Sequence, residues 1–255
     1  MKPLITSRNN PVIAHYRELC QKKRTRRTEK LFPAEGLRLV REAVQAGLAG
    51  DILLTEAAAE KCADEFPDAW HISDDLGRYI AETEHPQGIF AVCRIPETAA
   101  GPLSPEGRYL VLHELQDPGN MGMILRTADA LGVDAVLSCR SCEVYSPKVV
   151  RATMGAIFRQ HVYELNDMQT LSDMLHAAGI RSFAAVLHRD ARPVTDCTLG
   201  KGCAVWIGNE GNGLSDEAVS LCEEKMIIPM PGNAESLNAA MAAGILMWEM
   251  TKTGK

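Results

Sequence analysis

The sequence predicts an α/β protein built in two parts, and three observations support this prediction. Apolar, strand-like segments alternate with helical segments along the 255 residues, a pattern typical of α/β folds. Several later segments, such as YLVLHEL (109–115) and AVWIG (204–208), are apolar on both faces, which favours a parallel sheet covered on both sides. Residues 96–108 (PETAAGPLSPEGR) contain three prolines and two glycines, and we expect them to form a linker between the two parts.

The part before the linker, residues 31–95, is predicted to be a small α/β domain. Leu37, Val40 and Val44 recur at helical spacing and Gly47 provides a stop signal, so a helix is expected over 33–47. The other expected elements are, in order, a strand at 51–55, a helix at 57–66, a short strand at 69–73, a helix at 74–83 and a strand at 88–94.

The part after the linker, residues 109–255, is predicted to hold the parallel sheet. Its expected strands occupy residues 109–115, 135–139, 161–165, 182–187, 204–208 and 226–230, with helices between them. In open parallel sheets, ligands bind beyond the carboxyl ends of the strands. The residues that follow each strand are therefore the first candidates for a functional site.

Composition and cysteine content favour a cytoplasmic globular protein. Hydrophobic residues make up 46% of the chain and charged residues 24%. No apolar run reaches the roughly 18 residues of a membrane span, and the N-terminus has no apolar signal-peptide core. The eight cysteines lack framework spacing, which suits a reducing compartment. The C-x-x-C at Cys139 and Cys142 has no second pair and no neighbouring histidine, so we expect no bound metal.

The first 30 residues form a basic segment, which we treat as an N-terminal arm (1–30). It carries nine Lys or Arg residues and two Glu residues, although the whole chain has a net charge of −6. Clustered cations bind nucleic acid by releasing counterions from its phosphates, so we take as candidate contacts Lys22, Lys23, Arg24, Arg26 and Arg27. Lys148 and Arg151, three apart on an expected helix, are further candidates. A solvated helix or a disordered arm would explain the same charges.

Three loops that follow predicted strands are rich in polar residues or glycine. In the first, residues 117–120 form a turn, Asn120 is expected to cap the next helix, and Arg126 lies off that helix's apolar face. The second, GNEGNG (208–213), has three glycines that allow the backbone to approach a ligand closely. The third, residues 228–238, leads into an apolar terminal helix with Ser236 as its expected N-cap, and a cap explains only one of its polar residues. None of these loops matches a dinucleotide fingerprint or a Walker loop.

Together, the three loops resemble the signature motifs of the SpoU/TrmH family of RNA ribose methyltransferases, within the SPOUT superfamily. DPGNMGMILRTADALGV (117–133) resembles the first motif, WIGNEGNGLS (206–215) the second and IPMPGNAESLNAAMAAGIL (228–246) the third. The front part is more weakly similar to the family's L30e-like substrate-binding domain, through FPAEGLRLVREAV (32–44) and HPQGIFAV (85–92). The resemblance covers nearly the whole chain.

The resemblance implies an S-adenosylmethionine-dependent enzyme that methylates a ribose 2′-hydroxyl. The family binds its cofactor in a deep trefoil knot near the C-terminus, a rare exception to the rule against threaded chains. Its members are typically homodimers with the terminal helix at the interface. By position, the implied cofactor pocket contains Gly208, Asn209, Gly211, Ile228, Met230 and Leu237.

The resemblance also assigns catalytic roles by position. Arg126 takes the central role in activating the hydroxyl, and Asn120 and Asn238 can orient Arg126 or the ribose. Glu210 fixes the second loop or steers Arg126, and Ser236 holds the third loop or contacts the substrate. Because a guanidinium is protonated at any ordinary pH, we expect Arg126 to clamp a phosphate and stabilise a developing alkoxide, with the proton passing to water or phosphate.

Other functions remain open at this point. They are a base methyltransferase of the same superfamily, a tRNA rather than rRNA 2′-O-methyltransferase, and a non-catalytic RNA-binding protein. A nucleotide-dependent oxidoreductase fits the α/β pattern but lacks the fingerprint loop. The basic arm and the L30e-like domain favour ribosomal RNA as the substrate.

Overall fold

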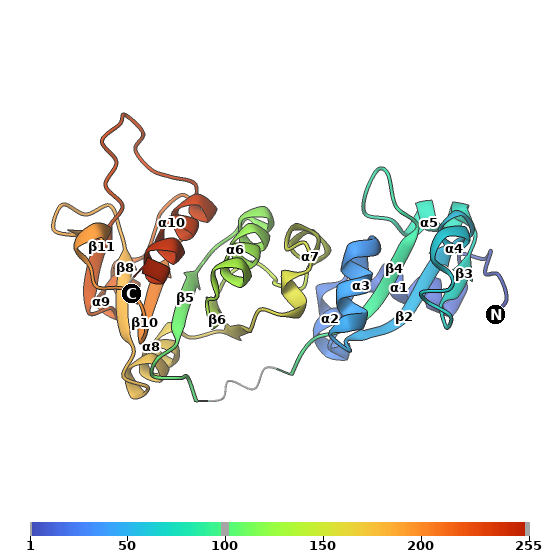
Figure 1. Cartoon of the computed structure of the whole chain (residues 1–255), viewed down its shortest axis with the longest axis horizontal. Helices are drawn as coiled ribbons and strands as arrows, with labels where there is room; N and C mark the ends of the chain where they lie inside the picture. Colours follow the sequence, from blue (N-terminus) through green and yellow to red (C-terminus); the bar gives the residue numbers. More distant parts are fainter. Residues whose placement is uncertain (1, 98–101, 253–255) are drawn as a thin grey trace. The chain divides into compact units, whose positions relative to one another are not determined.

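The computed structural model describes residues 2–97 and 102–252, which form two compact units (Figure 1). Unit 1 comprises the described residues up to Glu97 together with Glu143–Arg159, and unit 2 comprises the remaining described residues. Residues 98–101 of the predicted linker lie outside the described residues. Both units combine helices with a sheet, so the predicted α/β class is confirmed. None of the described helices is long and apolar enough to cross a membrane.

Unit 1 contains a four-stranded mixed sheet with the order β1-β4-β2-β3. β4 pairs antiparallel with β1 and β2, and β3 lies parallel to β2. The strands are β1 (Leu31–Glu35), β2 (Ala49–Thr55), β3 (Trp70–Ile72) and β4 (Ile89–Arg94). The helices of this unit are α1 (Pro11–Gln21), α2 (Lys23–Glu29), α3 (Leu37–Gln45), α4 (Glu56–Cys62), α5 (Asp74–Ile80), α7 (Pro147–Ala152) and the 3-10 helix η1 (Ala156–Phe158).

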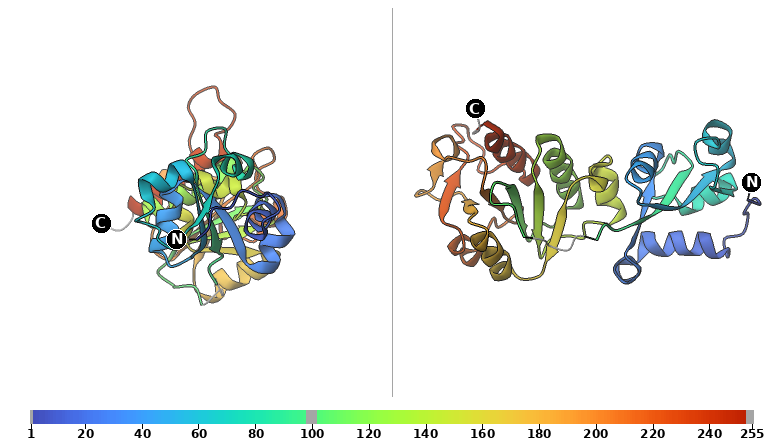
Figure 2. Two further views of the ribbon diagram at one scale, coloured as in Figure 1. Left: turned by 90° about the vertical axis from the view of Figure 1, so that its right-hand side faces the viewer. Right: turned by 60° about the horizontal axis from the view of Figure 1, so that its bottom comes forward.

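The N-terminal basic segment is part of unit 1 rather than a separate arm. Helix α1 is seen on one side of the sheet in the right-hand view of Figure 2. Its apolar residues Ile13, Tyr16 and Leu19 are buried in a cluster with Leu53 and Phe90 of the sheet. The apolar face of α1 therefore anchors this basic segment in the hydrophobic core of unit 1.

Residues 31–35 form strand β1, whereas the sequence predicted a helix that starts at residue 33. Gly36 explains the difference, because its φ of 102° is a conformation that interrupts a helix and favours glycine. The helix then begins at Leu37. Val40 is buried as predicted, together with Leu39 and Ala43, whereas Val44 of the predicted apolar face is 44% exposed.

Residues 143–159 lie in unit 1, although the sequence placed them in the second domain. Arg26 of α2 donates two hydrogen bonds to Glu143, from Nε to Oε1 at 2.8 Å and from Nη2 to Oε2 at 2.6 Å. Phe32 of β1 contacts Tyr145 and Phe158, with ring centroids 5.1 and 5.7 Å apart. Paired charges and aromatic contacts at long sequence separation account for this segment's position.

Unit 2 contains a seven-stranded sheet with the order β7-β6-β5-β10-β8-β11-β9, in which every pair is parallel. The strands are β5 (Arg108–His113), β6 (Ala135–Cys139), β7 (Val162–Leu165), β8 (Arg181–Ala185), β9 (Arg192–Pro193), β10 (Cys203–Ile207) and β11 (Glu224–Ile227). β5, β6 and β10 are buried on both faces, as their continuous apolar sequences predict.

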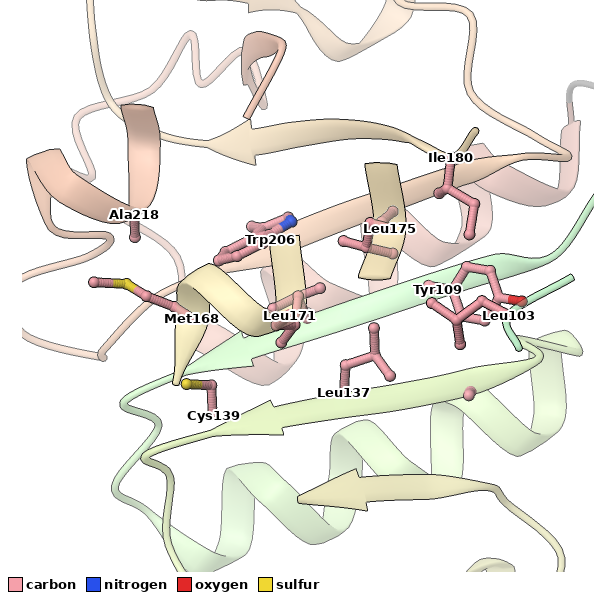
Figure 3. Close-up of a cluster of buried hydrophobic side chains, with 13 residues drawn as sticks. Leu103, Tyr109, Leu137, Cys139, Met168, Leu171, Leu175, Ile180, Trp206 and Ala218 are labelled. Atoms are coloured by element: carbon pink, nitrogen blue, oxygen red, sulfur yellow. The ribbon is translucent and has the colours of Figure 1, made fainter. Parts of the chain in front are cut away.

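Helices pack against this sheet and bury its apolar side chains. They are α6 (Pro118–Leu131), α8 (Met168–Ala177), the 3-10 helix η2 (Val194–Asp196), α9 (Asp216–Ser220) and α10 (Ala239–Lys252). On one face, Leu171 and Leu175 of α8 pack with Leu137 and Trp206 of the sheet (Figure 3).

The Ala- and Gly-rich terminal helix α10 packs against α6. A β-carbon at Gly244 would be in ordinary van der Waals contact, at 3.9 Å, with Cγ2 of Thr127 on α6. The small residues of α10 therefore allow close packing between helices, as the sequence predicted.

Parallel strands end at the same edge of the sheet, so the loops after β5, β8, β10 and β11 gather there. The loop from β11 to α10 is long and projects from unit 2 in Figure 1 and in the left view of Figure 2. This edge contains all three loops that the sequence singled out.

Candidate active site

A cavity of ≈ 440 Å³ lies at this edge of unit 2. Its walls come from three segments: residues 185–188 after β8, residues 207–214 after β10, and residues between 226 and 246 around the β11–α10 loop. All six residues that the sequence assigned to cofactor binding line it: Gly208, Asn209, Gly211, Ile228, Met230 and Leu237. Glu210 and Ser236 also line the cavity.

The walls combine apolar and acidic groups. Leu187, Ile207 and Leu214 supply apolar surface, whereas Glu210 and Glu235 supply carboxylates. An apolar pocket with a few polar groups is typical of small-molecule sites. Carboxylates would favour a ligand that carries positive charge.

The glycine loop, residues 208–213, forms a tight turn directly after β10. Asn209 and Gly213 form a two-way bridge, with N–H to oxygen distances of 3.0 and 2.9 Å. A β-carbon at Gly208 would lie 2.1 Å from the carbonyl carbon of Gly213, so only glycine fits there. Gly213 has a φ of 67°, in the left-handed region that glycine adopts without strain.

The side chain of Asn209 fixes this loop to the end of β5. Its Oδ1 accepts hydrogen bonds from the backbone N–H groups of Gly211 (2.9 Å) and Asn212 (3.2 Å). Its Nδ2 donates to the carbonyl oxygen of Glu114 at 3.0 Å. Glu114 has a φ of 57°, an uncommon conformation for a residue other than glycine, and the sequence analysis did not single it out.

Glu210 joins the second loop to the first. Its carboxylate accepts hydrogen bonds from the backbone N–H groups of Gln116 (3.0 Å) and Asp117 (2.9 Å) and from Nδ2 of Asn120 (3.0 Å). Asn120 is buried, and its Oδ1 accepts a hydrogen bond from Nδ2 of Asn238 at 3.0 Å. The chain Glu210–Asn120–Asn238 thus links all three loops by side-chain hydrogen bonds, and we call it the Glu210 network.

The hydrogen bonds of the Glu210 network lower the pKa of the Glu210 carboxyl from its ordinary value. Partial burial on its own would raise this pKa, because it disfavours the charged form. The donors from Asn120, Gln116 and Asp117 outweigh burial and stabilise the carboxylate. The network therefore favours the charged form of Glu210.

Two helix caps differ from the sequence predictions. Asp117, not Asn120, caps α6, since its Oδ1 accepts from the N–H of Asn120 at 2.8 Å. Asn238, not Ser236, caps α10, since its Oδ1 accepts from the N–H groups of Ala240 (2.9 Å) and Met241 (3.3 Å). Each cap prediction placed the cap in the right loop but not at the residue beside the first helical turn. Ser236 is left free to line the cavity.

Arg126 is the one predicted catalytic residue that stands apart from the Glu210 network. It is exposed on α6 and does not line the cavity. Within residues 2–97 and 102–252 it makes no hydrogen bond or ion pair. The other four predicted catalytic residues, Asn120, Glu210, Ser236 and Asn238, either belong to the network or line the cavity.

The candidate RNA contacts fall into accessible and inaccessible residues. Lys23, Arg24, Arg27 and Lys148 are exposed, Lys22 is exposed and pairs with Glu18 at 2.9 Å, and Arg151 is half-buried.

Arg26 must be withdrawn from this set. It is only 4% exposed, and it binds Glu143 and the carbonyl oxygens of Leu19 and Cys20. Its donors are used within unit 1, so it serves the fold rather than RNA.

The end of β8 and the segment after it, where Ala185, Leu187 and His188 line the cavity, were not predicted from the sequence. The rule that ligands bind beyond strand ends applied here too. However, this segment has no glycine cluster or run of polar residues that would have distinguished it.

Comparison with known proteins identifies relatives of both parts of the chain. The SpoU rRNA Methylase family matches residues 107–248, and the MRM3-like substrate binding domain matches residues 10–91. The 23S rRNA (guanosine(2553)-2′-O)-methyltransferase RlmP of Bacillus subtilis is 32% identical over 96% of this chain and 98% of its own length. The 23S rRNA (uridine(2479)-2′-O)-methyltransferase of Streptomyces viridochromogenes is 30% identical over 90% of this chain and 85% of its own.

Solved structures resemble the whole chain as well. An AdoMet-bound rRNA methyltransferase from Sinorhizobium meliloti has a TM-score of 0.87 at 28% identity, covering 99% of this chain and 98% of that one. The SpoU methyltransferase AviRb from Streptomyces viridochromogenes, in complex with AdoMet, has a TM-score of 0.85 at 27% identity, covering 96% and 98%.

Replacing Glu210 by Gln should destabilise the protein at neutral pH but much less at low pH. Because the folded pKa is lowered, the carboxylate stabilises the fold above its unfolded pKa, and this contribution is lost as the pH falls through the folded pKa. Allowing for its exposure, we expect Glu210→Gln to lower the free energy of unfolding by about 1 kcal/mol at pH 7. Urea unfolding at about pH 3 and pH 7 measures both values.

Glu60→Gln is the matched control for this prediction. Glu60 is exposed on α4 and has no hydrogen bond or ion pair among the described residues. Its replacement should therefore change the free energy of unfolding little at either pH. If Glu210→Gln lowered the free energy of unfolding equally at both pH values, a charge-dependent network would be contradicted.

Proposed function

The chain belongs to the SpoU rRNA methylase family, and on that premise we propose that it transfers a methyl group from S-adenosylmethionine to a ribose 2′-hydroxyl of ribosomal RNA. The observation that carries the proposal for the site is the Glu210 network, which gathers the three loops beside one cavity.

The cavity suits S-adenosylmethionine in chemistry. Its apolar wall would accept the adenine ring, and the glycines Gly208 and Gly211 in its lining allow close approach. Its carboxylates, Glu210 and Glu235, would attract the cationic end of the cofactor. When bound, the cofactor supplies a methyl group activated by a positively charged sulfur.

We assign Arg126 to the substrate rather than to a proton-abstracting role. Its guanidinium carries five donors and stays protonated, so it can hold a backbone phosphate in a bidentate manner and stabilise negative charge as the 2′-oxygen loses its proton. The proton would leave to water or to a phosphate oxygen. Correct placement of the 2′-oxygen in line with the methyl group supplies much of the remaining rate.

The other predicted catalytic residues act mainly by position. Asn120, Glu210 and Asn238 hold the loops through the Glu210 network, while Ser236 lines the cavity where the ribose would enter. We expect Ser236 to contact the substrate or the cofactor.

A homodimer would bring Arg126 to a cavity. Met123 is 55% exposed and lies three residues before Arg126, so both side chains share one face of α6. On α10, Met241 and Trp248 are 57% and 54% exposed and seven residues apart, hence also on one face. We propose that these apolar side chains meet a second copy and that Arg126 of one protomer serves the partner's cavity.

The exposed cations and the relatives' substrates indicate which RNA the protein binds. Lys22, Lys23, Arg24, Arg27 and Lys148 remain candidate RNA contacts. Ribosomal RNA is preferred to tRNA because the two full-length relatives described above are named for 23S rRNA. The trefoil knot and a cytoplasmic location stay predictions, and the eight free thiols suit a reducing compartment.

Transfer of tritium from labelled S-adenosylmethionine to purified rRNA and tRNA tests the function, with the modified nucleoside identified by mass spectrometry. We expect a 2′-O-methylated nucleoside in rRNA. A methylated base would contradict the ribose assignment, and label confined to tRNA would contradict the rRNA assignment.

Arg126→Ala should lower the rate of methyl transfer by about 100-fold or more, because a donor to the developing charge is lost. Affinity for S-adenosylmethionine, measured by calorimetry, should change little, because we assign Arg126 to the substrate phosphate and not to the cofactor. Arg126→Lys keeps the positive charge but cannot form the bidentate contact with a phosphate, so it should retain part of the activity. A wild-type rate for Arg126→Ala would rule out its role.

Trp248→Glu should produce a monomer in sedimentation velocity, because it buries a charge in the proposed apolar interface. The monomer should still bind S-adenosylmethionine but transfer methyl groups poorly, since Arg126 would no longer reach a partner's cavity. Met154→Glu is the control, as Met154 is an exposed apolar residue of unit 1. A fully active Trp248→Glu monomer would contradict the shared site.

A further inference from the structure

A large groove lies in unit 1, away from the residues assigned to catalysis. Its volume is ≈ 950 Å³, more than twice that of the cavity in unit 2 at ≈ 440 Å³. Its walls come from the helices α3, α4 and α5 and from the loop before β4. All its lining residues fall between Leu37 and Ile89, within the stretch that matches the MRM3-like substrate binding domain.

Six charged side chains line the groove: Arg38, Arg41, Glu42, Lys61, Asp74 and Arg78. Four of them are occupied within unit 1. Arg41 binds Glu65 through two hydrogen bonds of 2.6 and 2.8 Å, and Arg78 binds Asp75 at 2.5 Å. Glu42 pairs with Arg159, and Asp74 accepts from the N–H of Ala57 at 3.2 Å.

The two remaining charges are both positive. Arg38 and Lys61 are exposed, and neither has a hydrogen bond or an ion pair among the residues that the structure describes. They come from different helices, α3 and α4, that border the same groove. The groove therefore presents uncompensated cations to any ligand that enters it.

The wall between α3 and the loop before β4 is held in place by internal contacts. Oε1 of Gln87 accepts a hydrogen bond from the N–H of Leu37 at 2.8 Å. Gly88, with a φ of 76°, lies so close to Thr55 that a β-carbon there would be 2.2 Å from its hydroxyl oxygen. A wall fixed in this way loses little conformational entropy when a ligand binds.

We propose that this groove binds the sugar-phosphate backbone of the substrate RNA, with Arg38 and Lys61 contacting phosphates. The proposal rests on the proposed function, because it takes RNA as the substrate. Two free cations on different helices of one groove suit a chain that carries a regular series of negative charges. An acidic protein segment would satisfy the same charges, but the proposed reaction supplies RNA as the polyanion.

The groove makes a specific prediction for the salt dependence of RNA binding. If the groove holds RNA, neutralising Arg38 and Lys61 removes two phosphate contacts. The slope of log affinity against log salt concentration should then become shallower by about 1.5. Methyl transfer at saturating RNA should be unaffected, because the chemistry takes place in unit 2.

The test uses the full-length protein and an in vitro 23S rRNA transcript that the wild type methylates. For the double variant Arg38→Ala/Lys61→Ala, we expect the Kd for this RNA and the KM for RNA to rise about tenfold at low salt. We expect kcat and the Kd for S-adenosylmethionine to stay within twofold of wild type. The charge-preserving double variant Arg38→Lys/Lys61→Arg should restore most RNA affinity.

Lys201→Ala serves as a matched control, because Lys201 is an exposed lysine of unit 2 outside both the cavity and the groove. It should bind RNA as the wild type does. RNA affinity within twofold of wild type for Arg38→Ala/Lys61→Ala, in a protein that methylates RNA, would overturn the groove and leave the proposed function intact. Failure of the wild type to methylate any RNA would instead overturn the proposed function.

Discussion

The carboxylate of Glu210 is the interaction on which the candidate active site depends. It accepts three hydrogen bonds from the first loop, and Asn120 passes the connection to Asn238 in the third loop. These contacts join residues that are 90 and 118 positions apart in the chain. Hydrogen bonds to a charged acceptor are stronger than neutral ones, so one ionised side chain can hold three loops together. Asn238 also caps α10, which couples the terminal helix to the same network.

The parallel sheet makes this convergence possible. Strands β5, β10, β8 and β11 lie next to one another and run in one direction, so their following loops share one edge. Glycine then determines how closely the loops can approach, since Gly208 leaves no space for a side chain beside Gly213. The proposed reaction has two separate requirements: a cavity for the cofactor, which unit 2 would supply, and a cationic group for the substrate. Arg126, exposed and outside the cavity, fits the second only if another molecule meets α6.

The sequence predicted the α/β class and most strands, because continuous apolar segments and glycine stops are local signals. It also predicted the three loops, since their polar residues and glycines are concentrated in short segments. Long-range pairing was not predictable. Arg26 looked like its exposed neighbours, and only the carboxylate of Glu143, 117 residues away, explains why it is buried. Strand β1 was taken for helix because its strand partner β4 lies far along the chain. The cap at Asn238 and the cavity residues after β8 carry no distinctive local pattern.

The central claim is that the Glu210 network holds the cofactor cavity in shape, and Asn120 tests it most directly. Asn120 is 8% exposed and does not line the cavity, so it can affect the cofactor only through the loops that it joins. Calorimetric titration of S-adenosylmethionine into Asn120→Ala, in protein shown to be folded by circular dichroism, measures this effect. The account predicts a Kd about tenfold higher than that of the wild type, the equivalent of one lost hydrogen bond of about 1.4 kcal/mol. Wild-type affinity in the folded variant would contradict it.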